Sequence, residues 1–204
     1  MIDREIARTL LKEKAVFLRP NDPFTWTSGI KSPVYCDNRL LISTVAPREM
    51  IVDAFCAEIK KLNVDIISGT ATAGIPWAAF VAQKLNLPMV YVRSSSKDHG
   101  RQNAIEGKAS RGMKTVLMED LISTGKSSIA AAAKLQEEGV EVVKIFSIFT
   151  YGFAEATKVF SEAGFSCQSL TNFDILAQVA FDDHQLDKAT LDQVLSWRKS
   201  VTFP

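Results

Sequence analysis

Hydrophobic and polar positions alternate along the chain in blocks that predict helices and strands in turn. Residues 3–18 place apolar side chains among charges, as in an amphipathic helix followed by a short extended piece. Pro20, Pro23 and Gly29 then punctuate a loop-rich region. From Ser43 onward the apolar positions recur at helical spacing, which predicts a second helix.

Short buried strands alternate with further helices after this point. A helix is expected from Pro76 to about Leu85, and a later one ends at Gly139 as its C-cap. The tail from about residue 167 adds a short strand and helices, with Thr190 as the expected N-cap of the last helix. The predicted central strands are residues 65–68, 89–92, 115–118 and 142–149. Repeated strand, loop and helix units predict an α/β fold with a central, mostly parallel sheet flanked by helices.

Composition limits the class of protein. A chain of 204 residues with 47% hydrophobic content is expected to form a single domain with one sizeable core. The net charge of +1 gives no overall field that favours DNA or an anionic membrane, and no apolar run approaches the ~20 residues of a membrane span. The three cysteines, Cys36, Cys56 and Cys167, are widely spaced, which predicts small buried side chains in a reducing, cytoplasmic protein.

The loops that follow three of the strands are chemically unusual. They come after Ser68, Val92 and Met118. Because the carboxyl ends of parallel strands meet at one edge of a sheet, these loops are expected to converge on one rim, where such sheets bind ligands.

Residues 116–128 are the most informative stretch of the chain. An apolar strand is followed by Glu119 and Asp120, and then by the small polar turn 123–125 that opens a helix. Two carboxylates can accept hydrogen bonds from a vicinal diol, while the backbone N–H groups of the turn and the positive end of the helix attract a phosphate. The run therefore predicts a site for a ribose 5′-phosphate.

A P-loop and a plain helix cap each match part of this run. Residues 125–127 fit the second half of a P-loop, but the first glycine of that motif would fall at Asp120, whose charge would repel a triphosphate. Ser123 and Thr124 would also serve as ordinary N-caps. Capping alone leaves the two acids without a role.

A second loop, residues 68–76, contains only small residues before a helix start. Small residues let backbone amides approach an anion closely, which suits a diphosphate. The spacing of Gly69 and Gly74 does not match the dinucleotide-binding fingerprint. A tight strand-to-helix connection is the alternative, and the expected place of the loop on the rim favours the anion site.

A third loop, residues 93–107, is polar and charged, with too few apolar side chains to pack. It concentrates Arg93, Lys97, His99 and Arg101, which an enzyme that expels pyrophosphate would need around its leaving group. Closure of such a loop would also exclude water. A solvated charge run is the plain alternative.

Aromatic residues and Lys31 lie together in residues 24–39. Aromatic rings can stack on a flat heterocycle, and backbone amides and Lys31 can meet a carboxylate. An aromatic stripe is more often part of a core, so the residues alone leave both roles open.

Three of these segments resemble the orotate phosphoribosyltransferases, a branch of the type I phosphoribosyltransferases. Residues 119–125 are similar to the signature that binds phosphoribosyl diphosphate (PRPP). Residues 97–100 with 105–107 resemble the catalytic loop of the orotate branch, and residues 28–33 resemble the segment that covers orotate. The resemblance extends from about residue 17 to residue 181.

This resemblance implies a type I phosphoribosyltransferase fold over residues 1–204. A small hood subdomain would be formed by about residues 1–40 and the C-terminal tail, over a core of about residues 41–165. It implies a glycosyltransferase that transfers the 5-phosphoribosyl group from PRPP to orotate, giving orotidine 5′-monophosphate and pyrophosphate in de novo pyrimidine synthesis. The implied cofactor is Mg²⁺, held mainly through PRPP and water with no direct protein ligand. The implied assembly is a homodimer that shares the catalytic loop across its interface, with no nucleic-acid or membrane partner.

The resemblance also assigns roles to residues. Arg93, Lys97 and His99 would be catalytic and neutralise the departing pyrophosphate, while Ser123 and Lys31 would bind orotate. The expected PRPP-binding residues are Arg93, Lys97, His99, Glu119, Asp120, Leu121, Ile122, Ser123, Thr124, Gly125, Lys126 and Ser127.

Two other functions fit parts of the sequence. A purine phosphoribosyltransferase would share the PRPP signature, but residues 28–39 follow the orotate pattern. A non-catalytic PRPP-sensing regulator would need a nucleic-acid-binding part, and the chain has no basic stripe. The chain also has no arginine in residues 151–155, where some relatives carry one that binds orotate.

Overall fold

The centre of the protein is a six-stranded sheet with the order β10-β9-β8-β5-β6-β7. We analysed a computed structural model, which describes residues 1–26, 29–94 and 104–203. Every neighbouring pair of strands is parallel except β6 and β7, so the predicted mostly parallel sheet is confirmed. The strands are β5 (Ile66–Thr70), β6 (Met89–Val92), β7 (Ile105–Glu106), β8 (Lys114–Ile122), β9 (Glu141–Thr150) and β10 (Cys167–Asn172).

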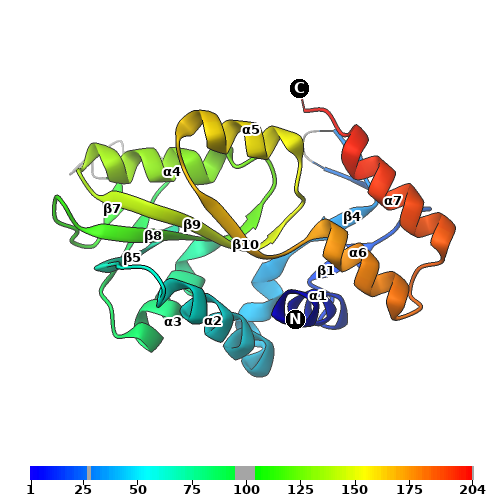
Figure 1. The fold of residues 1–204 in the computed structure, drawn as a ribbon, viewed down its shortest axis with the longest axis horizontal. Helices are drawn as coiled ribbons and strands as arrows, with labels where there is room; N and C mark the ends of the chain where they lie inside the picture. Colours follow the sequence, from blue (N-terminus) through cyan, green and yellow to red (C-terminus); the bar gives the residue numbers. More distant parts are fainter. Residues whose placement is uncertain (27–28, 95–103, 204) are drawn as a thin grey trace.

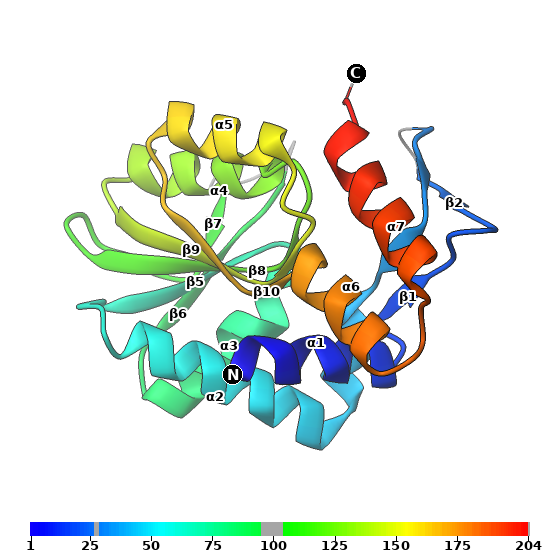
Figure 2. The same cartoon turned by 45° about the vertical axis from the view of Figure 1, so that its right-hand side comes forward.

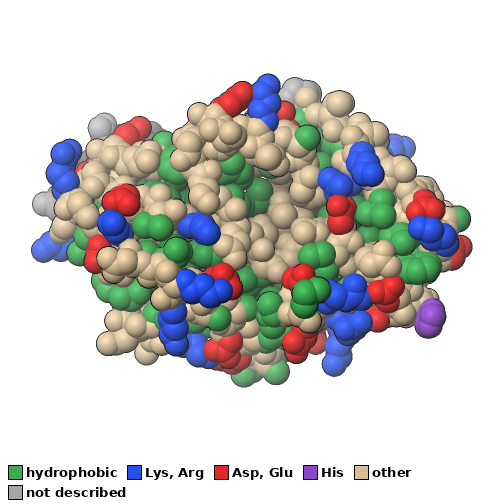
Figure 3. Space-filling model, in the orientation of Figure 1, with side chains coloured by type: hydrophobic (Ala, Val, Ile, Leu, Met, Phe, Trp, Pro, Cys, Tyr) green, Lys and Arg blue, Asp and Glu red, His purple; other side chains and the backbone are tan. Residues whose placement is uncertain are grey.

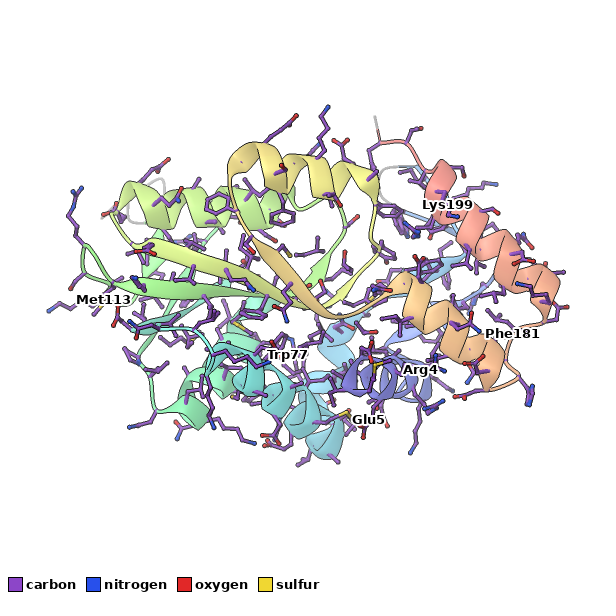
Figure 4. All side chains as sticks on the ribbon, viewed as in Figure 1. Arg4, Glu5, Trp77, Met113, Phe181 and Lys199 are labelled. Carbon is purple, nitrogen blue, oxygen red and sulfur yellow. The ribbon has the colours of Figure 1, made fainter. Side chains whose placement is uncertain are left out.

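Helices cover both faces of this sheet (Figure 1). One face packs against α1 (Ile2–Lys12), α2 (Val45–Ile59) and α3 (Gly74–Leu85), and the other against α4 (Lys126–Glu137) and α5 (Ala154–Ala163). Trp77 of α3 is fully buried in the larger of the two hydrophobic clusters, beneath the sheet in Figure 4. Burial of two opposite sheet faces explains why the central strands are apolar without alternation.

A smaller layer lies beyond one end of the sheet, where segments from the two ends of the sequence meet (Figure 2). Two antiparallel pairs, β1 (Val16–Leu18) with β4 (Val34–Cys36) and β2 (Phe24–Thr25) with β3 (Lys31–Ser32), are followed by the 3₁₀ helix η1 (Asn38–Ser43). The C-terminal helices α6 (Phe173–Asp182) and α7 (Lys188–Ser200) complete the layer. Its division from the core as a hood subdomain stays a prediction.

Ion pairs hold α1 against the end of α6. Arg4 pairs with Asp182, and Figure 4 shows Arg4 on the side of α1 that faces α6. Arg8 donates from Nε and Nη2 to the two carboxylate oxygens of Asp183, both at 2.7 Å. These pairs are partly exposed, so we assign most of the stabilisation of this contact to the fully buried apolar face of α1.

Several predicted boundaries were wrong. Helix α3 begins at Gly74 and not at Pro76, and the C-cap of α4 is Glu138 and not Gly139. Thr190 is not the N-cap of the last helix: the side chain of Asp187 accepts a hydrogen bond from the Thr190 N–H at 2.7 Å, and the helix begins at Lys188. The strand predicted at residues 115–118 runs from Lys114 to Ile122, because β9 continues to pair with it as far as Ile122 and Thr150. Glu119 and Asp120 therefore lie within the last part of β8 and not after it.

The prediction of buried, unpaired cysteines is confirmed for Cys36 and Cys56 but not for Cys167, which is only half-buried. All three are free thiols. In the part of the chain that the structure describes, no helix is both long and apolar enough to span a membrane.

Candidate active site

The three unusual loops begin side by side at one rim of the sheet. Strands β8, β5 and β6 are parallel neighbours, with Gly69 opposite Met118 and Thr70 opposite Val92. The segments that follow Thr70, Val92 and Ile122 therefore leave the sheet side by side. This confirms the arrangement expected from the carboxyl ends of parallel strands.

The small residues of the loop after β5 allow a very close approach to β8. A Cβ added to Gly74 would lie 2.2 Å from the carbonyl oxygen of Met118, and one added to Gly69 would lie 3.0 Å from Cβ of Ala78. Only glycine therefore fits at residue 74. This contact brings the first turn of α3 against the strand that carries the two acids.

Glu119 lies deep beneath the rim, with 6% of its surface exposed. The Ser128 hydroxyl, on α4, donates a hydrogen bond to its Oε2 at 3.1 Å. Burial, together with the charge of Asp120, raises the pKa of Glu119 to about 8, while the hydrogen bond from Ser128 acts in the opposite direction. At neutral pH the Glu119 carboxyl in the unliganded protein is therefore largely protonated.

The pKa of Glu119 predicts a pH-dependent stability. Because its folded pKa of about 8 exceeds its ordinary value of 4.5, the folded state retains a proton that the unfolded state has released between these values. The free energy of unfolding should therefore fall by roughly 1.4 kcal/mol per pH unit across this window from this group alone. We expect Glu119→Gln to remove this slope, as measured by urea unfolding at several pH values between about 5 and 8.

Glu138→Gln is the matched control, because Glu138 is exposed at the far end of α4. The free energy of unfolding of this variant should depend on pH as that of the wild type does. If Glu119→Gln also runs parallel to the wild type, the assignment of a raised pKa to Glu119 is wrong.

Asp120 points to the opposite side of the strand, because successive side chains of a strand alternate between its faces. Its surroundings are the residues that follow β4: Asn38 Nδ2 donates to the Asp120 carbonyl at 2.7 Å, and the charge of Arg39 favours the ionised carboxylate. Burial outweighs these effects and raises the pKa of Asp120 above its ordinary value. Arg39 is itself held by two hydrogen bonds to Asp37, at 2.6 and 2.9 Å.

The turn after β8 has the geometry expected of an anion site. Gly125 is the N-cap of α4 with a φ of +80°, and a Cβ there would lie 2.5 Å from the Phe160 ring. Since glycine has no side chain to cap the helix, the N–H groups of its first turn remain oriented toward the rim. Lys126 and Ser127 are exposed beside them.

The cationic residues expected near pyrophosphate are only partly described. Arg93 follows β6, where its Nη1 lies 3.4 Å from Glu106 Oε1 and its carbonyl accepts a hydrogen bond from Lys134 Nζ at 2.9 Å. Lys97 and His99 lie outside the described residues. Lys31 is exposed on β3.

A pocket of about 320 Å³ lies between the turn after β8 and the smaller layer. Ser123 and Thr124 contribute from the rim, so the structure places Ser123 beside the aromatic segment, as its predicted contact with a base requires. Cys36 also lines this pocket; its thiol donates to Asn38 Oδ1 at 3.3 Å, and burial raises its pKa well above its ordinary value. The lining residues are Trp26, Tyr35, Cys36, Leu121, Ser123, Thr124, Tyr151 and Phe203.

Several of these groups were not predicted from the sequence. Tyr151 directly follows β9, so the tendency of ligands to bind at the carboxyl ends of parallel strands would have predicted it. Ser128 and Asn38 were missed because their contacts, with Glu119 and Asp120, depend on the packing of α4 and η1. Nothing in the local sequence signalled Phe203.

The two acids of β8 do not form a chelating pair for a metal ion. Within residues 1–26, 29–94 and 104–203, no group of three or more His, Cys, Asp or Glu side chains is arranged to hold a metal. Glu119 and Asp120 point to opposite faces of β8, so they cannot chelate one ion together. Mg²⁺ in such a site would take most of its oxygens from phosphates and water.

Charges of both signs are interspersed over the face seen in Figure 3. This distribution agrees with the net charge of +1. Attraction of an anionic ligand therefore depends on the local donors of the rim.

Comparisons with known proteins agree with this geometry. The phosphoribosyl transferase domain family matches residues 43–184. The orotate phosphoribosyltransferase of Listeria monocytogenes serotype 4b (strain F2365) is 49% identical over 201 residues, which cover 98% of this chain and 96% of that protein. Its counterpart in Coxiella burnetii (strain RSA 493 / Nine Mile phase I) is 48% identical over 197 residues, covering 96% of this chain and 94% of that protein.

A solved structure extends the likeness to three dimensions. The crystal structure of orotate phosphoribosyltransferase from Aeropyrum pernix has a TM-score of 0.76 and 26% sequence identity, covering 89% of this chain and 99% of that chain. Because almost half of the residues are identical over nearly the whole length of these relatives, and the fold agrees, the chain belongs to the orotate phosphoribosyltransferase family.

Proposed function

We propose that the chain catalyses the reaction of its family with PRPP and orotate as substrates and Mg²⁺ as cofactor, giving orotidine 5′-monophosphate and pyrophosphate. The observation that supports this most directly is the adjacency of three features at one rim. The strand with Glu119 and Asp120 suits the ribose hydroxyls, the N-terminus of α4 suits the 5′-phosphate, and the aromatic pocket suits a flat base.

The reaction requires charge stabilisation more than covalent chemistry. As pyrophosphate leaves C1′, the ribose gains oxocarbenium character, and a fixed negative charge nearby lowers the barrier. Asp120 supplies that charge from the side of β8 that faces the smaller layer, and Thr124 to Ser127 hold the 5′-phosphate at the far end of the sugar. The ribose and its 5′-phosphate are then both positioned by β8 and the turn that follows it.

Mg²⁺, when bound, would neutralise the diphosphate and help fix the ribose oxygens. Arg93, Lys97 and His99 would neutralise the departing pyrophosphate, and Lys31 and Ser123 would contact orotate. The product is a pyrimidine nucleotide, which places the reaction in pyrimidine biosynthesis. The three free cysteines suit a reducing, cytoplasmic location.

An assay with several bases tests this function. Orotate consumption, followed by its absorbance with PRPP and Mg²⁺, should be rapid, whereas hypoxanthine, guanine, adenine and uracil should give little turnover. Turnover of a purine without orotate would show that the chain is a purine phosphoribosyltransferase. PRPP binding without turnover of any base would favour the sensing regulator.

We further propose that the enzyme is a homodimer in which the catalytic loop of one chain completes the site of the other. Leu40 of η1 and Val45 at the start of α2 are large apolar residues that are 46% and 62% exposed. A dimer interface over this surface would bury them. Mixing inactive Lys97→Ala and Asp120→Asn chains should then restore activity, because a hybrid dimer holds one site with both residues intact. Random exchange should recover roughly a quarter of the wild-type rate.

The control is each variant exchanged with itself, which should recover no activity. Absence of recovery in the mixture, with subunit exchange verified, would mean that each site is completed within one chain.

A further inference from the structure

The C-terminal helix α7 connects the two walls of the aromatic pocket. The Trp197 Nε1–H donates to the carbonyl of Lys31 on β3 at 2.9 Å. The next residue, Arg198, donates from Nη1 to the carbonyl of Gly152 at 2.9 Å and from Nη2 to Asp174 Oδ2 at 2.9 Å. Two consecutive side chains therefore tie the β2–β3 hairpin to the loop that follows β9, and Figure 2 shows α7 lying beside this N-terminal layer.

Beyond α7 the chain turns into the pocket. The helix ends at Ser200, and the half-buried ring of Phe203 packs edge-on against Phe153 with 4.9 Å between ring centroids. Phe203 also lines the pocket, together with Ser123 and Thr124 of the rim. Phe153 in turn stacks on Tyr151, and Tyr151 lies 5.1 Å from the Trp26 ring, so Phe203 continues an aromatic wall.

The walls of this pocket are uncharged. Each of the described side chains that line it is aromatic, aliphatic, a thiol or a hydroxyl. Residues 151–155 offer no arginine. A base in this pocket must therefore gain much of its affinity from contact with aromatic surface.

We propose that Phe203 is a base-contacting, specificity-determining residue of the enzyme, and that Trp197 is a positioning residue that fixes the β2–β3 hairpin over the same base. This inference rests on the proposed function, because it assumes that the pocket holds the orotate ring. The C-terminal segment thus completes the base pocket, while the PRPP half of the site is built without it.

Steady-state kinetics of single variants provide the first test. We expect Phe203→Ala to raise the orotate KM about tenfold, the range expected for loss of one aromatic contact with a base, with kcat and the PRPP KM within about twofold of wild type. Phe203→Tyr, which keeps the ring, should restore the orotate KM. Thr202→Ala is the matched control, since Thr202 is the exposed neighbour of Phe203 and should leave all constants unchanged.

Trp197→Phe keeps an aromatic ring, although a smaller one, and removes the N–H donor to the Lys31 carbonyl. We expect a smaller rise in the orotate KM, about threefold, without change in the PRPP KM. A merely structural role for Trp197 would instead lower the unfolding midpoint and affect both substrates alike.

Equilibrium binding separates the base from the sugar. By titration calorimetry, Phe203→Ala should weaken binding of orotidine 5′-monophosphate about tenfold and leave binding of ribose 5-phosphate unchanged. Equal weakening of both ligands, or an unchanged affinity for orotidine 5′-monophosphate in a folded variant, overturns the proposal. Failure of the proposed function would appear separately, as absence of orotate turnover by the wild-type chain.

Discussion

Asp120→Asn is expected to lower kcat/KM for PRPP by roughly 100-fold or more, because the reaction loses a fixed negative charge beside the cationic ribose. Asparagine keeps the volume of aspartate, so the backbone of β8 and the hydrogen bond from Asn38 to the residue 120 carbonyl should persist. Stability should not fall: burial raises the pKa of Asp120, which means that the fold disfavours its ionised form. Initial rates and urea unfolding of the same preparation measure both effects.

The matched control is Asp65→Asn, the same change at an exposed residue just before β5, at the opposite end of the sheet. Asp65 accepts a hydrogen bond from the Lys114 N–H at 2.8 Å, so its replacement can alter stability slightly but should leave kcat/KM unchanged. If Asp120→Asn lost less than about threefold in kcat/KM, Asp120 would have no electrostatic role in the transition state.

Gly74→Ala is expected to lower the free energy of unfolding by about 3 kcal/mol and to reduce activity with it. The new Cβ would lie 2.2 Å from the Met118 carbonyl oxygen, and a backbone oxygen within a sheet cannot rotate away as the end of a side chain can. Either α3 or β8 must shift, and β8 carries Glu119 and Asp120 immediately after Met118. The midpoint of urea unfolding and kcat/KM should therefore both fall.

Gly112→Ala provides the comparison. Gly112 has a φ of +86° and open space around its missing Cβ, so alanine there incurs a conformational cost of about 1 kcal/mol without a clash. It should leave activity intact. A loss of stability at Gly74 no larger than at Gly112 would contradict the tight contact between α3 and β8.

The order of elements and the place of the site were both predictable from local patterns. An apolar run followed by a small polar turn predicts a strand and the start of a helix wherever it occurs, and parallel strands bring their carboxyl ends together. These two rules predict that residues 69–74, Arg93 and residues 119–127 share one rim, and the structure confirms the convergence. The ends of the elements were less predictable, as the extension of β8 to Ile122 shows, because pairing with β9 decides where the strand stops.

The sequence by itself determined the α/β fold class, the position of the site at the rim and the PRPP signature, because each depends on patterns of residues that are close together in the chain. Only the tertiary structure decided that Glu119 is buried beside Ser128, that Asp120 faces the smaller layer, and that Phe203 lines the same pocket as Trp26. The Glu119–Ser128 contact depends on how α4 packs against β8, and the other two features depend on packing between segments that are far apart in the sequence. Local periodicity carries no information about such contacts, since they arise from the shape and burial of the whole fold.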